Sequence, residues 1–366
     1  MKPFRFGDVV PAEFQCPQPV LLKTVLDHLA SGQKVLLQGE RRMGKTSFVR
    51  FTVAPRLKRR LFHVSLWGVK TVDDLTRQCL LALQRMKRDD TLASKAARIL
   101  KERLGPSLAI GGISIAMAPA TPLGMDVLES VLDEVWSEHQ VKPVFAFWDE
   151  FQEILKMPGA DDIIGRLRSM IQHHTGMAYV FAGSDRNRMH GIFNHPKSPF
   201  FKGAATMEFD RIGTAVFTKW LRTRFALGEV TVPDAIMEEI FTITDRVSGD
   251  VQQLCSALWD VAERGATLGE RHLAQACRVL WGGESRTYEM IVGETTALQM
   301  RCLRTLARLP GIQATGSEFL RESGASSPSS VARALDRLVG QSILRKRGAT
   351  HTFVNPFFRL WLNRKE

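Results

Sequence analysis

The segment from residue 34 to residue 55 restricts the possible fold more than any other part of the sequence. A short apolar run, "KVLLQ", leads into Gly39-x4-Gly44-Lys45-Thr46, and the residues that follow have helical spacing up to Pro55. Glycines in this pattern let successive backbone N–H groups face phosphate oxygens at a helix N-terminus. The Lys reaches the β- and γ-phosphates, and the Thr hydroxyl binds Mg²⁺. The sequence therefore predicts a buried strand, a phosphate-binding loop and a helix, in that order.

The whole loop is expected to contact a nucleotide, with ATP and Mg²⁺ as the ligands. An incidental turn is the alternative, but the motif lies between a strand and a helix, as phosphate binding requires. The residues predicted to bind the nucleotide are Gly39, Glu40, Arg41, Arg42, Met43, Gly44, Lys45, Thr46 and Ser47.

A second apolar run, residues 143–148, ends in two acids, Asp149 and Glu150. A continuous apolar run of this length is typical of a central strand in a parallel sheet. On a strand that neighbours the loop, Asp149 would hold the Thr46-bound Mg²⁺ through water, and Glu150 would polarise the attacking water. The alternative is that both acids cap the helix that follows. We expect Lys45, Asp149 and Glu150 to be catalytic.

The run "AYVFAGS" over residues 178–184 predicts another buried strand, which ends in Ser184. From the strand adjacent to the loop, this hydroxyl would point at the γ-phosphate and take part in catalysis as a sensor; a helix cap is the alternative role. Strand candidates alternate with helical patterns along this part of the chain, which indicates an α/β fold with a parallel sheet. The strand candidates are residues 34–38, 61–67, 143–150 and 178–184.

The strand signal stops after about residue 208, and the sequence then predicts three helices in succession. The last part of the chain predicts helices at 295–309, 315–323 and 327–341, followed by two β-rich runs around a charged turn. Within the core, a helix is expected over 71–104 and a loop or hairpin over 105–123. The predicted domains are a nucleotide-binding core with its lead-in (1–207), a helical domain (208–283) and a C-terminal domain (284–366).

The C-terminal domain carries a candidate DNA interface. Ser327 is a plausible N-cap and Pro328 the first residue of a helix whose apolar stripe faces inward. A helix in the major groove and a basic β-turn on the phosphate backbone would together bind duplex DNA. Binding to a protein partner is the alternative. The predicted DNA contacts are Ser329, Ser330, Arg333 and Arg337 on the helix and Arg345, Lys346 and Arg347 at the turn.

The charge of the chain agrees with a polyanionic partner. The formal net charge is +12, and residues 284–366 carry 13 Lys and Arg against seven acids, so half of the excess lies there. A basic surface that serves solubility is the alternative. No apolar run reaches the roughly 18 residues of a membrane helix, and the five cysteines have no metal-binding spacing. We therefore expect a cytoplasmic protein that does not bind membranes.

Four segments together resemble a known family. The segments "GERRMGKTS", "WDEFQEI", "FAGSDRNRM" and "VNPFFRLWL" are similar to those of the archaeal-type ATPases of the AAA+/STAND class of P-loop proteins, which are distantly similar to the archaeal replication-origin initiators. The resemblance spans nearly the whole chain. It implies an ASCE-type P-loop core, then a helical lid, then a winged-helix domain. It also implies Walker A roles for Lys45 and Thr46, Walker B roles for Asp149 and Glu150, and the sensor 1 role for Ser184.

The chain departs from the family pattern at three places. It reads "CPQPVLLKTV" where the family has an Arg-Glu pair near the nucleotide base, Lys202-Gly203 where the family has Gly-Arg, and Val251 where the lid has proline. These departures concern how the base is bound and how the lid completes the site. The candidates for an arginine finger are Arg186, Arg188 and Arg211.

Two functions are compatible with these features. The first is an ATP-hydrolysing switch whose winged helix acts on DNA. The second is a nucleotide-gated regulator or scaffold with little turnover, whose winged helix binds a protein partner or a second copy of the chain. A small-molecule kinase is disfavoured, because such enzymes need no appended winged helix. Arg41 and Arg42 would touch the nucleotide, the lid or a partner.

Overall fold

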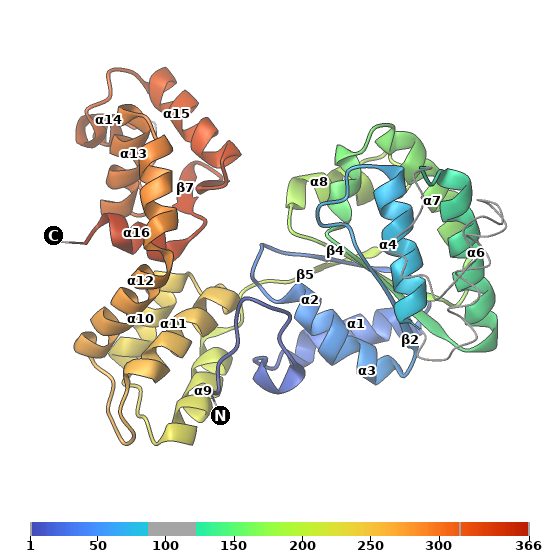
Figure 1. Cartoon of the computed structure of the whole chain (residues 1–366), viewed down its shortest axis with the longest axis horizontal. Coiled ribbons are helices and arrows are strands. Elements are labelled where there is room, and N and C mark those ends of the chain that lie inside the picture. Colours follow the sequence, from blue (N-terminus) through green and yellow to red (C-terminus); the bar gives the residue numbers. More distant parts are fainter. Residues whose placement is uncertain (1, 87–121, 315, 365–366) are drawn as a thin grey trace. The chain divides into compact units, whose positions relative to one another are not determined.

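The computed structural model describes residues 2–86, 122–314 and 316–364. The described chain forms two compact units (Figure 1). One unit comprises Gly7–Gly213 and contains a five-stranded sheet. The other comprises Met1–Phe6 and Thr214–Glu366 and is mainly helical. The predicted helix over 71–104 is described as far as residue 86, and most of the predicted loop at 105–123 lies outside the described residues.

All strands of the five-stranded sheet are parallel, in the order β2-β3-β4-β1-β5. The strand β4 therefore separates β1, which precedes the glycine loop, from β3, which ends in Asp149. The sequence predicted four of these strands but not β5. It placed Asp149 on a strand that neighbours the loop, whereas in the structure β4 lies between the strand of Asp149 and β1. The bounds are β1 Val35–Gln38, β2 Arg60–Ser65, β3 Val144–Asp149, β4 Ala178–Gly183 and β5 Ala205–Glu208.

Helices cover both faces of this sheet (Figure 1). Alternate residues of β3 point to opposite faces: Ala146 and Trp148 join one apolar cluster with residues of α4, α6 and α7, and Phe147 points to the other side. The bounds of the helices are α1 Pro19–Ala30, α2 Lys45–Phe48, α3 Ala54–Leu57, α4 Val72–Arg85, α6 Met125–Val141, α7 Ala160–His173 and α8 Arg186–Phe193.

The helix after the glycine loop differs from the prediction. It does not end at Pro55 but continues through α3 to Leu57, with a π-helical stretch, Val49–Val53, between α2 and α3. Pro55 lies in the first turn of α3, where its missing N–H leaves no helical hydrogen bond unmade. The wider turn therefore accommodates a proline that the sequence suggested would end the helix.

The mainly helical unit begins with a helical bundle. Its bounds are α9 Thr214–Phe225, α10 Asp234–Thr244, α11 Ser248–Val261 and α12 Glu270–Glu294. The helix α12 is 25 residues long and contains the predicted boundary between residues 283 and 284. The three predicted domains stay a proposal, because α12 crosses the predicted boundary between the helical domain and the C-terminal domain.

The C-terminal part packs the helices α13 to α16 and a two-stranded ribbon around Leu303, Leu335 and Phe358. Ser327 caps α15 by accepting a hydrogen bond from the Ser330 N–H, and Pro328 begins the helix, as predicted. The basic residues do not lie in the turn of the ribbon, however. They belong to β6, and the turn is formed by Gly348 and Ala349. The bounds are α13 Ala297–Arg308, α14 Ser317–Ser323, α15 Pro328–Gly340, β6 Leu344–Arg347, β7 Thr350–Phe353 and α16 Pro356–Leu362.

The N-terminal residues belong to both units. Phe4 is 1% exposed and packs on Phe225, with a ring-centroid distance of 4.8 Å, and on Trp220 and Trp259. A few residues later the chain contacts the glycine-loop helix, where the Val10 N–H donates to the Ser47 hydroxyl at 2.9 Å. Residues 2–6 thus complete the core of the helical unit, whereas the residues around Val10 complete the sheet unit.

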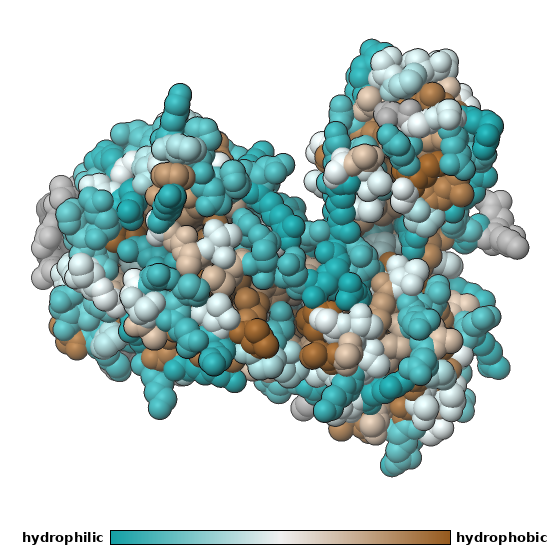
Figure 2. Space-filling model, turned by 180° about the vertical axis from the view of Figure 1, so that it is seen from behind, coloured by the Kyte–Doolittle hydropathy of each residue, from teal (hydrophilic) through white to brown (hydrophobic). Residues whose placement is uncertain are grey.

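The visible surface is mainly hydrophilic, with small and separate hydrophobic patches (Figure 2). Among the described residues, no helix is both long enough and apolar enough to cross a membrane.

Candidate functional site

The loop between β1 and α2 is held from two sides. The Gly39 N–H donates to the Gly183 carbonyl of β4 at 3.2 Å, and the Phe209 N–H after β5 donates to the Gln38 carbonyl at 2.7 Å. A Cβ at residue 39 would lie 2.4 Å from the Phe209 carbonyl oxygen, so only glycine fits there. Gly44 has φ +99° at the N-cap of α2, a left-handed conformation that glycine adopts most readily. Both motif glycines are therefore required by the backbone.

Lys45 lies inside the curl of this loop. Its ammonium donates to the carbonyl oxygens of Gly39 at 2.6 Å and Glu40 at 2.8 Å. Burial lowers the pKa of Lys45, and the carboxylates of Glu150 and Asp149 oppose that shift. The loop thus encloses a positive charge that two carboxylates stabilise.

The other side chains of the loop take different positions. Met43 is 2% exposed and packs in the core, so that only its backbone can face a ligand. The Ser47 hydroxyl accepts from the Val10 N–H, and Glu40 pairs with Arg211 at 3.3 Å. Arg41 and Arg42 are exposed, and Arg42 has a positive φ of 63°.

Thr46 and Asp149 form an oxygen pair at the end of β3. The Thr46 hydroxyl donates to Asp149 Oδ2 at 2.6 Å, and Asp149 is 5% exposed. Burial raises the pKa of Asp149 to about 6, although the hydrogen bond from Thr46 opposes the shift. A nearby cation would favour the charged carboxylate. The two residues predicted to hold Mg²⁺ are therefore in direct contact.

Glu150 directly follows β3, and its carboxylate lies at the end of the neighbouring strand, β4. Its backbone is left-handed, with φ 52° and ψ 44°, which is unusual for a residue other than glycine. Its carboxylate accepts hydrogen bonds from the Ser184 hydroxyl at 2.5 Å and from the Gln152 amide. Because the backbone turns at Glu150, the two acids point in different directions. Asp149, Glu150 and Ser184, which the sequence predicted to be catalytic, thus lie at the carboxyl ends of β3 and β4.

Two further residues of this edge were not predicted. Gln152 is 1% exposed; besides Glu150, its amide also donates to the Ser184 hydroxyl at 3.3 Å. His63 stacks on Phe147, with ring centroids 4.7 Å apart, and its Nε2 lies 3.9 Å from Asp149 Oδ2. Burial lowers the pKa of His63 to about 4, so its ring is neutral at pH 7. The fixed spacing in "DEFQ" was a signal for Gln152; nothing in the sequence pointed to His63.

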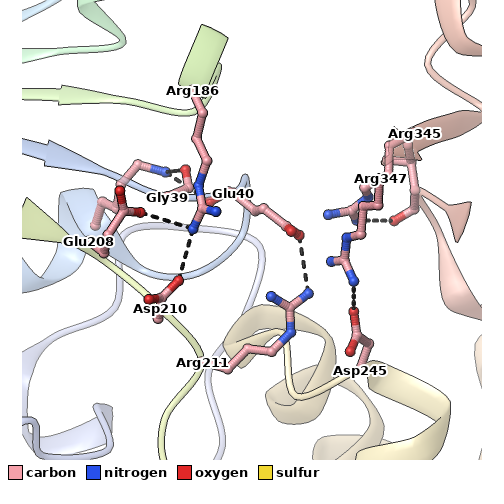
Figure 3. A network of polar contacts seen from close by, with 11 residues as sticks. Gly39, Glu40, Arg186, Glu208, Asp210, Arg211, Asp245, Arg345 and Arg347 are labelled. Atoms are coloured by element: carbon pink, nitrogen blue, oxygen red, sulfur yellow. Dashed lines mark hydrogen bonds and ion pairs between the residues drawn. The ribbon is translucent and has the colours of Figure 1, made fainter. Parts of the chain in front are cut away.

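The candidate arginine fingers all pair with acids of their own unit. Arg186 pairs with Asp210 at 2.8 Å and with Glu208 at 3.0 Å (Figure 3). Arg211 reaches Glu40 of the loop, and Arg188 pairs with Asp185. Of these three, Arg211 is the one that contacts the glycine loop.

The predicted DNA contacts divide into two groups. On α15, Ser329, Arg333 and Arg337 are exposed and Ser330 is half-buried. On β6, Lys346 is exposed, whereas Arg345 and Arg347 are half-buried. Arg347 forms an ion pair with Asp245, which follows α10 (Figure 3). The exposed cations therefore lie mainly on the helix.

Comparison with known proteins identifies the fold. A family model described as a probable winged helix domain matches residues 286–364. No curated protein matches the sequence. Among solved structures, a Walker-type ATPase of Pyrococcus abyssi is similar over 98% of this chain and 99% of its own, with 15% identity and a TM-score of 0.65. The chain has a Walker-type ATPase fold. The Aeropyrum pernix ORC1 protein, solved in complex with DNA, is also similar, over 97% of this chain and 95% of its own, with 15% identity and a TM-score of 0.50.

The Walker-type fold confirms the predicted fold class, and its neighbours include the origin-recognition proteins that the resemblance implied. The order β2-β3-β4-β1-β5 explains how the site is assembled, because β4 brings Ser184 between the loop and Glu150. In this chain the residues matched by the winged-helix model, 286–364, follow the helices α9 to α11. The roles of the individual residues stay predictions.

Proposed function

We propose that this protein binds ATP with Mg²⁺ and hydrolyses it to ADP and phosphate. The observation that carries the proposal is the convergence of Lys45, Thr46, Asp149, Glu150 and Ser184 at one edge of a parallel sheet. Ligands of open α/β sheets bind at the carboxyl ends of the strands. The loop supplies backbone N–H groups and a lysine for phosphates, and β3 supplies the two acids.

The oxygen pair of Thr46 and Asp149 fits Mg²⁺. This ion takes hard oxygen ligands, and it usually binds one or two carboxylates together with substrate phosphates and water. A hydroxyl in contact with a nearly buried carboxylate provides such oxygens. When bound, Mg²⁺ would neutralise charge on the phosphates; Thr46 and Asp149 would hold it.

Glu150 would act on the attacking water. Hydrolysis forms a bond between the water oxygen and the γ-phosphorus, and it breaks the bond from that phosphorus to the bridging oxygen, which leaves with ADP. A proton of the water passes to Glu150 as the new bond forms. Ser184 and Gln152 hold the Glu150 carboxylate in place. Lys45 would stabilise the negative charge on the transferred phosphoryl group.

Phosphate release from ATP by the purified chain tests this proposal. With Mg²⁺ present, we expect turnover that the Lys45→Ala variant lacks, because no other cation is enclosed by the loop in the described residues. The control is the Lys202→Ala variant, which removes an exposed lysine outside the loop and should leave turnover unchanged. Equal phosphate release by the wild type and the Lys45→Ala variant would refute the assignment.

We further propose that the nucleotide state controls a DNA contact made by the winged helix. The exposed α15 cations, Arg333 and Arg337, and the exposed Lys346 support a phosphate-binding surface. The A. pernix ORC1 protein, whose fold is similar, was solved with DNA. Because the five cysteines are buried thiols, we propose that the protein works in the reducing cytoplasm.

Charge reversal on α15 tests the DNA contact. The double variant Arg333→Glu/Arg337→Glu should weaken duplex binding and reduce its dependence on salt, because each lost phosphate contact removes about 0.9 from the slope of log K against log salt. Fluorescence anisotropy with a labelled duplex at several salt concentrations measures both effects. Arg278→Glu changes an exposed arginine of α12 and serves as the control. A slope that the double variant leaves unchanged would remove α15 from the interface.

One observation favours the second function, a regulator whose winged helix binds a protein. Arg347 is paired with Asp245, and Arg345 is half-buried, so the ribbon presents fewer cations than the sequence suggested. In this alternative the chain holds its nucleotide with little turnover and binds a partner protein or a second copy. Unchanged duplex binding in the α15 variant, together with slow phosphate release, would favour it.

A further inference from the structure

Arg41 is a cation beside the site that has no part in the hydrolysis proposed above. Arg41 projects from the glycine loop, and its guanidinium carbon lies 4.5 Å from the centroid of the Trp67 ring. Trp67 follows β2 and is 59% exposed, which is unusual for so large an aromatic side chain. The exposed tryptophan and the loop arginine therefore form a stack at the surface.

The same arginine reaches the catalytic edge. Arg41 Nε lies 3.5 Å from the Ser184 hydroxyl oxygen, and that hydroxyl donates to Glu150 at 2.5 Å. Burial is the main cause of the lowered pKa of Lys45, and the charge of Arg41 lowers it further. Arg41 thus lies beside Ser184, and its charge also reaches Lys45, which the proposed function places at the terminal phosphate.

The strengths of the two possible contacts decide where Arg41 would lie when ATP is bound. A cation–π stack at an exposed position changes an equilibrium by about 2- to 5-fold. Hydrogen bonds from a charged donor to a charged acceptor change it by about 10- to 150-fold. A phosphate oxygen within reach would therefore displace the ring of Trp67 as the partner of Arg41.

We propose that Arg41 binds the terminal phosphate of ATP in cis, and that Trp67 holds its guanidinium beside the site when that phosphate is absent. This inference rests on the proposed ATP-binding function and extends it. The arginine of the loop then distinguishes ATP from ADP, because ADP lacks the group that it binds. Movement of Arg41 away from Ser184 would also couple the presence of the γ-phosphate to the Ser184–Glu150 hydrogen bond.

Nucleotide affinity provides the first test. The dissociation constants of ADP and of a β,γ-methylene analogue of ATP are measured with Mg²⁺ by calorimetry. Arg41→Ala should weaken binding of the analogue by about 10- to 150-fold and change ADP affinity by less than about 3-fold. Arg41→Lys keeps the charge but not the planar fork, so it should lose part of the preference. The control, Arg364→Ala, removes an arginine that stacks on Trp361 in the winged helix.

Tryptophan fluorescence provides a second readout, independent of turnover. The analogue should change the emission of the wild type, because the guanidinium leaves the Trp67 ring. Trp67→Phe should abolish this change, and Trp361→Phe should retain it. An unchanged ratio of analogue to ADP affinity in Arg41→Ala would overturn this inference but not the proposed ATP binding. A change in emission that persists in Trp67→Phe would do the same. If the wild type binds neither nucleotide, the proposed function fails as well.

Discussion

Replacing Glu150 with glutamine should slow ATP hydrolysis by about 10²- to 10⁴-fold while ATP still binds, because the amide cannot take a proton from the attacking water. Glutamine has the size of glutamate, and its amide can still meet the Ser184 hydroxyl and the Gln152 side chain. The contacts of Lys45 and Thr46 do not involve the changed atoms. The loss should therefore appear in the rate of the chemical step rather than in affinity.

Single-turnover measurements separate the rate of the chemical step from the affinity for ATP. Excess protein is mixed with ATP and Mg²⁺, and the first-order rate of phosphate formation is compared with the affinity from calorimetry. Glu153→Gln is the matched control, because it makes the same substitution three residues away at a carboxylate that pairs with Lys156. A Glu150→Gln variant that forms phosphate at the wild-type rate would exclude Glu150 as the proton acceptor.

Replacing Phe4 with alanine should destabilise the helical unit by about 3–5 kcal/mol, the usual range for removing a buried Phe ring. Phe4 is 1% exposed, and its ring packs against Trp220, Phe225 and Trp259. All three partners belong to the same unit as Phe4. The ring is therefore part of a core that lies more than 200 residues away in sequence, and its removal leaves a cavity between α9 and α11.

Hydrogen exchange of the α9 and α11 amides, resolved by mass spectrometry, measures this effect. A chain with two compact units need not unfold in one step, so the free energy of unfolding has to be read for each unit. Phe6→Ala is the matched control: Phe6 is 43% exposed and should contribute less than about 1 kcal/mol. Equal protection of α9 in the Phe4→Ala variant and the wild type would show that the aromatic cluster is stable without this ring.

The sequence pointed to residues that the structure brings to the carboxyl edge of the sheet, because phosphate-binding motifs need particular residues in a particular order. Gly39 and Gly44 were recognisable, since a Cβ at the first would meet Phe209 and the second needs φ +99°. Asp149 was recognisable because it ends a run of apolar residues that is buried along its whole length. All three residues lie in short stretches of recognisable sequence, so a motif identifies them even where, as at Gly39, the physical reason is a tertiary contact.

The features that were missed depend on tertiary contacts. The strand β5 is half-exposed at the edge of the sheet, so it has no continuous apolar run to mark it. Gln152 contacts Glu150 only because the backbone of Glu150 is left-handed. Arg347 was predicted to contact DNA from the turn of the ribbon, but Asp245, about a hundred residues earlier, pairs with it. Sequence spacing does not record such pairings.

The division of residues 2–15 between the two units has a consequence for the order of events during synthesis. Residues 2–6 leave the ribosome before the sheet unit, Gly7–Gly213, but the partners of Phe4 in α9 and α11 are made after it. Since domains generally fold as units while the chain grows, the sheet unit can fold while Phe4 is still exposed. The helical unit then closes over a side chain made some 200 residues earlier. Its assembly therefore depends on translation having passed the sheet unit, Gly7–Gly213.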